Sequence, residues 1–263
     1  MRLPFSVFIL LFFYSTFSFS QTWEIGVTGG GLGYMGDLNQ NDFKKINHPA
    51  FGGMVKRNFD GYWSLKLAVL SGKISDDESK SPFAHEVNRN LSFFSPLTEG
   101  SLQVELNFFN YGFGFRQSKI TPYLFSGVTV AVFNPKANLN GSIYELKYYN
   151  TEGQESYNTS TYSIPFGAGA KFNFGQYFNL IGEIGFRNTS TDYLDDVSGY
   201  YANPTQLQGN SPEITAIKMA LADRSANKIG VPGTQRGDFR KKDSYIFVGL
   251  TLSYTFVSQK CPF

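Results

Sequence analysis

Cysteine and histidine are scarce in this chain. Its single cysteine, Cys261, excludes an intrachain disulfide and a cysteine metal cluster. Its two histidines, His48 and His85, leave little for general acid–base catalysis. The net charge of +2 gives no broad electrostatic basis for binding nucleic acid. The sequence therefore offers no nucleic-acid partner and no cofactor.

Long apolar runs are missing beyond the start of the chain. No later stretch approaches the about 18 consecutive apolar residues of a membrane helix. The start itself has a basic residue, an apolar run and small residues up to Ser20, which is the order of a secretory signal peptide. We expect cleavage before Gln21, which leaves a signal peptide over 1–20 and one domain over 21–263; an uncleaved anchor helix is the alternative. A secreted chain without disulfides fits a bacterial envelope.

Aromatic residues and glycine are abundant, with 27 Phe, 16 Tyr and 27 Gly. The clearest pattern is the alternation from Ser244 to Phe256, because a period of two predicts a β-strand. One face is apolar throughout: Ile246, Val248, Leu250, Leu252, Tyr254 and Phe256. The other face becomes small and polar. This arrangement fits a strand between lipid and a polar lumen, and an edge strand of a soluble sandwich is the alternative.

Seven earlier segments alternate in the same way. We expect these strands at about 22–34, 49–58, 62–73, 100–112, 119–133, 161–173 and 177–189. The connections between the eight strands alternate long and short, as in outer-membrane barrels, which have long external loops and short periplasmic turns. The sequence therefore predicts an all-β, eight-stranded antiparallel up-and-down transmembrane β-barrel in the bacterial outer membrane. Its surroundings would be the lipid bilayer and lipopolysaccharide.

Charged residues occupy positions that should face the lumen. They are Glu24, Lys66, Glu105, Glu183 and Arg187, together with Lys56 and Lys171. Buried charges need partners of opposite sign, and an eight-stranded barrel is just wide enough to be filled by its own side chains. We therefore predict a lumen charge network instead of an ion path. Aromatic residues such as Trp23, Trp63, Phe178 and Tyr254 should form a belt near the periplasmic strand ends.

Three short motifs are weak. Gly31 to Gly36 matches the dinucleotide pattern G-x-G-x-x-G, but no amphipathic helix follows, so close strand packing is the expectation. Arg236-Gly237-Asp238 matches the integrin-binding tripeptide, and a loop entering the last strand explains it equally well. Asp192, Asp195 and Asp196 offer oxygen ligands for calcium, but their spacing matches no known calcium loop. We expect turn and cap chemistry there and no metal site.

The histidines are the remaining candidates for catalysis. Some small outer-membrane barrels are enzymes that modify lipid A with a histidine and a serine at the outer rim. His85 has Ser79 and Ser81 near it in sequence, whereas His48 has no serine close by, and both histidines fall in predicted external loops. No second feature supports either histidine, so we expect no enzyme and no catalytic residue.

One segment suggests a family. The stretch from Glu183 to Tyr201 resembles the signature segment of PorG-type outer-membrane proteins, which belong to the type IX secretion machinery of Bacteroidota. Its most specific part is Thr191-Asp192-Tyr193-Leu194-Asp195-Asp196-Val197. Three other stretches are similar to that family in the same order: Gly33–Asn39, Thr121–Gly127, and Arg236–Asp238 with Asp243–Phe247.

The resemblance implies a component of a protein-export apparatus. Such a barrel would anchor or contact the periplasmic ring, built from a lipoprotein and its partner subunit, without forming the conduit. Topology makes the short turns candidate periplasmic contacts through Arg57, Asp60, Arg116 and Lys119, together with the tail over 257–263. The signature segment would face outside, where we expect it to close the top of the barrel. The alternative is a stand-alone envelope barrel of the OmpA or OmpW kind, an adhesin or small-solute barrel.

Overall fold

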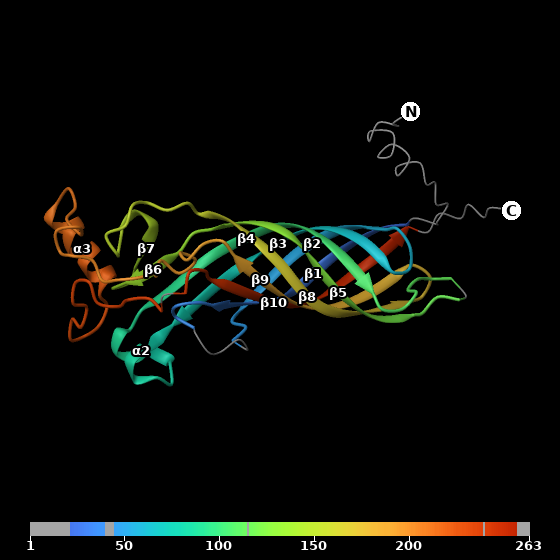
Figure 1. Cartoon of the computed structure of the whole chain (residues 1–263), viewed down its shortest axis with the longest axis horizontal. Coiled ribbons are helices and arrows are strands. Elements are labelled where there is room, and N and C mark those ends of the chain that lie inside the picture. The colour runs from blue at the N-terminus through green and yellow to red at the C-terminus, as the bar shows by residue number, and fades with distance from the viewer. Residues whose placement is uncertain (1–21, 40–44, 115, 239, 257–263) are drawn as a thin grey trace, which may run out of the picture.

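The computed structural model describes residues 22–39, 45–114, 116–238 and 240–256 (Figure 1). The predicted signal peptide and the tail over 257–263 lie outside these residues. Strands make up most of the described chain. Among its helices, none combines the length and the apolar character that crossing a membrane requires.

Eight long antiparallel strands close into a barrel (Figure 1). They are β1 (Thr22–Met35), β2 (His48–Asn58), β3 (Trp63–Asp77), β4 (Ser92–Asn107), β5 (Ile120–Phe133), β8 (Ser160–Phe174), β9 (Phe178–Thr189) and β10 (Ser244–Phe256). Each strand pairs with its neighbours in chain order, and β1 closes the sheet against β10, from Trp23 opposite Phe256 to Met35 opposite Ser244. The predicted eight-stranded up-and-down barrel is confirmed.

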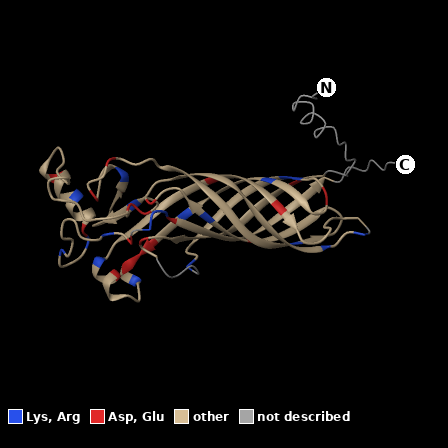
Figure 2. Cartoon of the chain, viewed as in Figure 1, with Lys and Arg blue, Asp and Glu red and all other residues tan. Residues whose placement is uncertain are grey.

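The barrel wall is apolar outside and polar inside. In β5, Val128, Val130 and Val132 are 63%, 51% and 57% exposed, while Thr129 and Ala131 between them are buried. In Figure 2 the charged residues are densest at the end of the molecule that carries the helices, and only a few lie along the barrel strands. This order is the reverse of a water-soluble barrel. The 13 residues of β10 span about 33 Å when tilted by about 40°, more than the ~25 Å apolar band of such barrels.

The two ends of the barrel differ in their connections. At one end, here called the turn end, the strands are joined by 59–62, 108–119 and 175–177. In the first of these, an Asp60 carboxylate oxygen accepts hydrogen bonds from the backbone N–H groups of Tyr62 and Trp63, both at 2.7 Å. At the other end, the loop end, the connections are loop 1 (36–47), loop 2 (78–91), loop 3 (134–159) and loop 4 (190–243).

The loops contain structure that the alternation did not predict. They hold η1 (Glu78–Lys80), α2 (Ala84–Arg89), β6 (Lys136–Leu139), β7 (Ser142–Glu145), η2 (Leu146–Tyr148) and α3 (Pro212–Ala222). The connection expected between the strands at 62–73 and 100–112 was too long, because β3 and β4 stay paired as far as Asp77 opposite Ser92. The inward positions there keep the alternation, with Ile74, Phe93 and Leu97 buried. The β3–β4 hairpin therefore extends into the loop end.

Candidate functional site

The predicted lumen charges do meet, and Glu105 of β4 lies at their centre. Its carboxylate oxygens lie 2.6 Å from Lys171 Nζ, 3.2 Å from Lys66 Nζ and 3.3 Å from Lys56 Nζ. The three lysines come from β8, β3 and β2, and alternation directs all of them inward. Ion pairs therefore connect four strands across the lumen, with Glu105 fully buried.

The network continues towards the loop end through Glu183 and Arg187 of β9. Lys66 Nζ lies 2.6 Å from a Glu183 oxygen, and Arg187 Nη2 lies 3.1 Å from Glu99 and 3.7 Å from Glu183. Glu24 joins through Lys56 at 3.3 Å. Sequence reasoning missed Glu99, because the fourth strand was expected to begin at about 100. Glu99 lies two residues before the buried Ser101, so strand alternation places both side chains on the inward face and would have identified Glu99 as a lumen residue.

The lumen is filled at the level of this network. A cavity of about 30 Å³ remains between Lys66, Glu105 and Arg187, which is enough for about two water molecules, since each needs roughly 10–15 Å³ of such space. Towards the turn end the lumen widens into an open cavity of about 680 Å³, lined in part by Tyr111 and Asn179. A folded or unfolded protein chain cannot pass the narrow level without removing the network.

At the loop end, the four loops fold into a cap with an apolar core of its own. Leu38 of loop 1, Leu91 of loop 2, Leu146 of loop 3, and Leu194 and Leu221 of loop 4 are at most 5% exposed and belong to one cluster. This cluster continues into the barrel through residues such as Leu32 and Phe247. The cap is therefore packed on the top of the lumen as part of one hydrophobic core.

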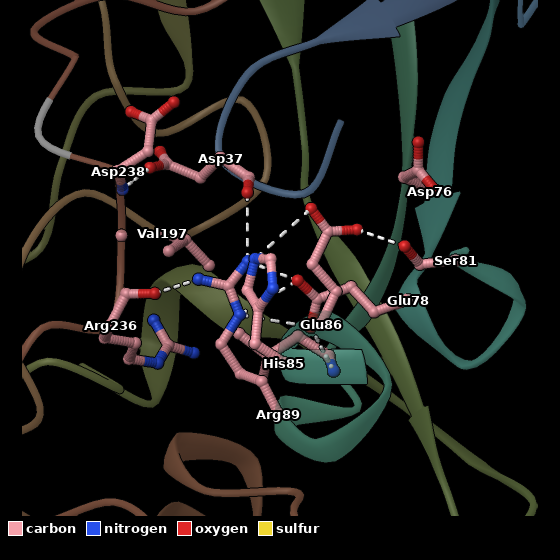
Figure 3. A network of polar contacts seen from close by, with 12 residues as sticks. Asp37, Asp76, Glu78, Ser81, His85, Glu86, Arg89, Val197, Arg236 and Asp238 are labelled. Carbon is pink, nitrogen blue, oxygen red and sulfur yellow. Dashed lines mark hydrogen bonds and ion pairs between the residues drawn. The ribbon is translucent and has the colours of Figure 1, made fainter. Parts of the chain in front are cut away.

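Two arginines link the loops of the cap. Arg89 of α2 donates from Nε to Glu78 at 2.9 Å, from Nη2 to the backbone carbonyl of Asp37 at 2.9 Å, and from Nη1 to the carbonyl of Arg236 (Figure 3). Arg236 donates from Nη1 to Glu152 of loop 3 at 2.9 Å and to the carbonyl of Asp196 at 3.0 Å. Together the two guanidinium groups connect all four loops.

The burial of Arg236 shows whether the Arg236-Gly237-Asp238 tripeptide can act as an integrin-binding motif. Arg236 is 3% exposed and its side chain points into the cap, so the tripeptide is not presented to a receptor. Burial alone would disfavour its charge, but the nearby Glu152 carboxylate raises the pKa of Arg236 above its usual value. The tripeptide is a structural part of loop 4.

The signature segment from Thr191 to Val197 lies inside this cap. The Asp196 carboxylate accepts hydrogen bonds from the Thr151 and Tyr157 hydroxyls of loop 3, both at 2.6 Å, and burial raises the pKa of Asp196 to about 6. The Tyr193 ring stacks on Tyr157 with centroids 4.5 Å apart. The segment thus joins loops 3 and 4.

The three aspartates considered for calcium do not converge on one point. Asp195 accepts from the Tyr34 hydroxyl at 2.5 Å, and Asp196 faces loop 3, as described above. Asp192 instead lies beside Asp37 of loop 1 and Asp243, the residue before β10. Burial, followed by repulsion from Asp195, raises the pKa of Asp37 to about 9, and burial raises that of Asp192 to about 6.

The four predicted periplasmic contacts all lie at the turn end, but their surroundings and exposure differ. The Arg57 guanidinium lies over the Trp23 ring, 4.8 Å from its centroid, on the outer wall. The Asp60 carboxylate accepts a hydrogen bond from the backbone of its own turn. Arg116 and Lys119 are exposed in the connection over 108–119. Of the four, these last two are the most accessible.

Of the two histidines, His48 is placed differently from the expectation, whereas His85 lies in a loop, as expected. His48 is the first residue of β2 and not part of a loop, and its Nε2 lies 2.6 Å from Ser75 Oγ of β3. His85 is exposed on α2, but the serines near it in sequence bind other groups: Ser81 donates to Glu86, and Ser79 to Asp77.

Comparison with solved structures finds other β-barrels at low similarity. The N-terminal β-barrel domain of Pseudomonas aeruginosa OprF is 12% identical, with a TM-score of 0.39, over 89% of this chain and 97% of that chain. Ail, the attachment invasion locus protein of Yersinia pestis, is 13% identical, with a TM-score of 0.37, over 90% and 97%. The outer membrane protein OprG from Pseudomonas aeruginosa is 8% identical, with a TM-score of 0.35, over 90% and 96%. The fold itself is given by the strand pairing.

Comparison with protein families and curated proteins gives one match. No curated protein matches the chain. The model of the family described as "Domain of unknown function (DUF6089)" matches residues 3–210. This match takes in seven of the eight barrel strands and the signature segment. The chain therefore belongs to the DUF6089 family.

Proposed function

We propose that the protein is an outer-membrane barrel that anchors or contacts the periplasmic ring of the type IX secretion machinery of Bacteroidota. The observation that carries this proposal is a filled lumen inside a barrel with an apolar exterior. The wall suits a place in lipid, and the cavity of about 30 Å³ at the charge network supports a role other than the protein conduit. We assign no catalytic residue, cofactor or nucleic-acid partner.

The direction of the barrel follows from its ends. An even number of strands brings Thr22 and Phe256 to the same, turn end. Outer-membrane barrels have short periplasmic turns and longer external loops. The turn end, with Arg116 and Lys119, would therefore face the periplasm and the ring subunits. The cap would face outside, among lipopolysaccharide.

The resemblance to PorG-type proteins supplies the secretion part of the proposal. Three of the four similar stretches meet in the cap. The Tyr34 hydroxyl contacts Asp195 at 2.5 Å and Asp243 at 3.1 Å, and the backbone N–H of Asp238 donates to Asp37. Segments that are distant in sequence thus form one structural unit, which supports reading the resemblance as a property of the whole fold.

Site-specific crosslinking in cells tests this proposal. A photoreactive residue at Arg116 or Lys119 should crosslink to the ring lipoprotein or its partner subunit, whereas one at Val231, which is 59% exposed in loop 4, should not. A deletion strain should also lose secretion of type IX cargo. A deletion strain that secretes normally would refute the proposal, as would crosslinks from Val231 only.

A stand-alone envelope barrel is the second candidate, and one observation favours it. The structure beyond the barrel lies at the loop end, and it exposes apolar side chains there, including Ile143 (62%), Tyr148 (63%) and Val231 (59%). An adhesin would use this surface. Replacing the three residues by serine should then abolish attachment while secretion of cargo stays intact.

A further inference from the structure

Three aspartates from separate parts of the chain meet beneath the cap. Asp37 belongs to loop 1, Asp192 to the start of loop 4, and Asp243 directly precedes β10. One carboxylate oxygen from each lies within 4.8 Å of the others. Two oxygens that bind a calcium ion at about 2.4 Å from opposite sides are about 4.8 Å apart. The three oxygens therefore fit one coordination sphere.

The cluster takes part in no ion pair among the described residues: from Lys45–Asp76 to Arg240–Asp238, none of these pairs involves Asp37, Asp192 or Asp243. Asp37 is 1% exposed, and its Oδ2 is buried without a hydrogen-bond partner, as is Oδ1 of Asp192. A buried, unpaired carboxylate oxygen is costly, so these two atoms indicate a missing positive ligand.

The remaining oxygens are held in place. Asp243 Oδ2 accepts from the Leu194 N–H at 2.9 Å, and Asp192 Oδ2 accepts from the Ser198 hydroxyl at 2.7 Å. Asp37 Oδ1 accepts from the N–H of Asp238. Each carboxylate thus has at least one oxygen fixed by the protein, which orients it without neutralising it.

Gly36 makes this close approach possible. A Cβ at this position would collide with Asp243 Oδ1 and with the Tyr34 hydroxyl. The Tyr34 hydroxyl has one proton but lies 2.5 Å from Asp195 and 3.1 Å from Asp243, so it cannot donate to both carboxylates at once. There are therefore fewer hydrogen-bond donors than carboxylate oxygens even around the Tyr34 hydroxyl.

We propose that Asp37, Asp192 and Asp243 bind a calcium ion that ties loop 1 and loop 4 to the top of β10. A set of carboxylate oxygens without nitrogen or sulfur favours a hard cation over zinc or copper. Calcium accepts six to eight oxygen ligands in irregular geometry, which suits three loop residues completed by water, whereas magnesium requires near-ideal octahedral geometry.

Terbium luminescence on the full-length protein, purified in detergent and stripped with chelator, tests the site directly. Terbium(III) binds where calcium does, and excitation of Tyr34 beside the site should sensitise its emission. Added Ca²⁺ should quench that emission with a dissociation constant in the range of about 10⁻⁵–10⁻³ M. Absence of sensitised emission, or equal displacement by Mg²⁺, would overturn the assignment of calcium.

Trypsin supplies a second measurement, because Lys241 and Lys242 are exposed immediately before Asp243. If cleavage requires loop opening and calcium binds only the closed form, cleavage should slow about 100-fold at a Ca²⁺ concentration 100 times the dissociation constant. The exposed Glu155 of loop 3 provides the control, since Glu155→Gln should keep the full calcium response.

The variant Asp37→Asn separates calcium binding from a purely structural acid cluster. It should lose the terbium signal and the calcium protection, yet in chelator it should resist trypsin at least as well as the wild type, because an asparagine amide can be buried there without a cation or a bound proton. Protection by calcium equal to that of the wild type would refute the proposal. If Asp37→Asn fails to give the folded electrophoretic mobility of the barrel, the half-buried Asp192→Asn takes its place with the same expected outcomes.

Discussion

Replacing Val128 by arginine tests whether the barrel wall faces lipid. Val128 lies in the middle of β5, which runs from Ile120 to Phe133, opposite Leu102 of β4. Its side chain is 63% exposed, so arginine meets no packed neighbour. At the mid-height of a membrane barrel, arginine lowers the free energy of unfolding by about 2–4 kcal/mol, and near the interface by about 0–1 kcal/mol.

The position along the strand makes the prediction quantitative. Ile120, at the turn-end start of the same strand, is 56% exposed, and Ile120→Arg should cost about 0–1 kcal/mol. Val231 of loop 4 is 59% exposed, close to Val128, but lies outside the barrel. Val231→Arg should therefore change the free energy of unfolding by less than about 0.5 kcal/mol.

Urea titration of the protein folded into lipid vesicles measures the three variants. The folded fraction can be followed by tryptophan fluorescence or by electrophoretic mobility without heating. The expected order of destabilisation is Val128→Arg, then Ile120→Arg, then Val231→Arg. Equal and small effects for Val128→Arg and Val231→Arg would refute a lipid-facing wall, because exposed valines in water should tolerate arginine equally well.

Three further predictions concern the lumen and the cap. Planar bilayers should show no porin-sized conductance steps, since about 30 Å³ remains at the charge network; stable large steps would contradict this. Glu105→Gln leaves three lysines without their shared anion and should cost about 3–5 kcal/mol in urea unfolding, against about 0–1 kcal/mol for Glu145→Gln, whose pair with Lys136 is partly exposed. Similar losses for both would rule out a buried network. Arg236→Met should speed trypsin cleavage of loop 4 and leave the folded mobility of the barrel unchanged; loss of that mobility would show that the barrel depends on the cap.

The barrel was predictable because its strands follow the alternation that a lipid-spanning barrel requires at every spanning residue. Outward positions such as Val128 and Leu250 must be apolar, and this requirement marks each strand in the sequence. Above the barrel wall the requirement ends. In the upper part of β3 the outward positions are Ser71, Lys73 and Ser75, so the contrast between faces disappears although the pairing with β4 continues. For this reason the β3–β4 hairpin was predicted too short.

The sites differ in the same way. The lumen charges follow from strand parity, so the alternation alone was enough to assign Glu105 and Arg187 an inward position. The aspartate cluster could not be found in this way, because Asp37, Asp192 and Asp243 come together only when loops 1 and 4 close over β10. Proximity in sequence pointed to the wrong set of aspartates. Asp195 and Asp196 lie close to Asp192 in the chain, but their side chains accept hydrogen bonds from Tyr34 and loop 3.

The seam between β1 and β10 has a consequence for how the protein is made. Ser253 of β10 donates a hydrogen bond to Glu24 of β1, 229 positions earlier. The first strand can therefore complete its pairing only after the last strand has been made. Before β10 is in place, the backbone N–H and C=O groups along one edge of β1 and one edge of β9 are unpaired. Such edges are costly in lipid, and in water they promote aggregation. For the proposed outer-membrane barrel the chain would therefore have to arrive unfolded, and a product truncated before Ser244 should be degraded or aggregate instead of forming a smaller barrel.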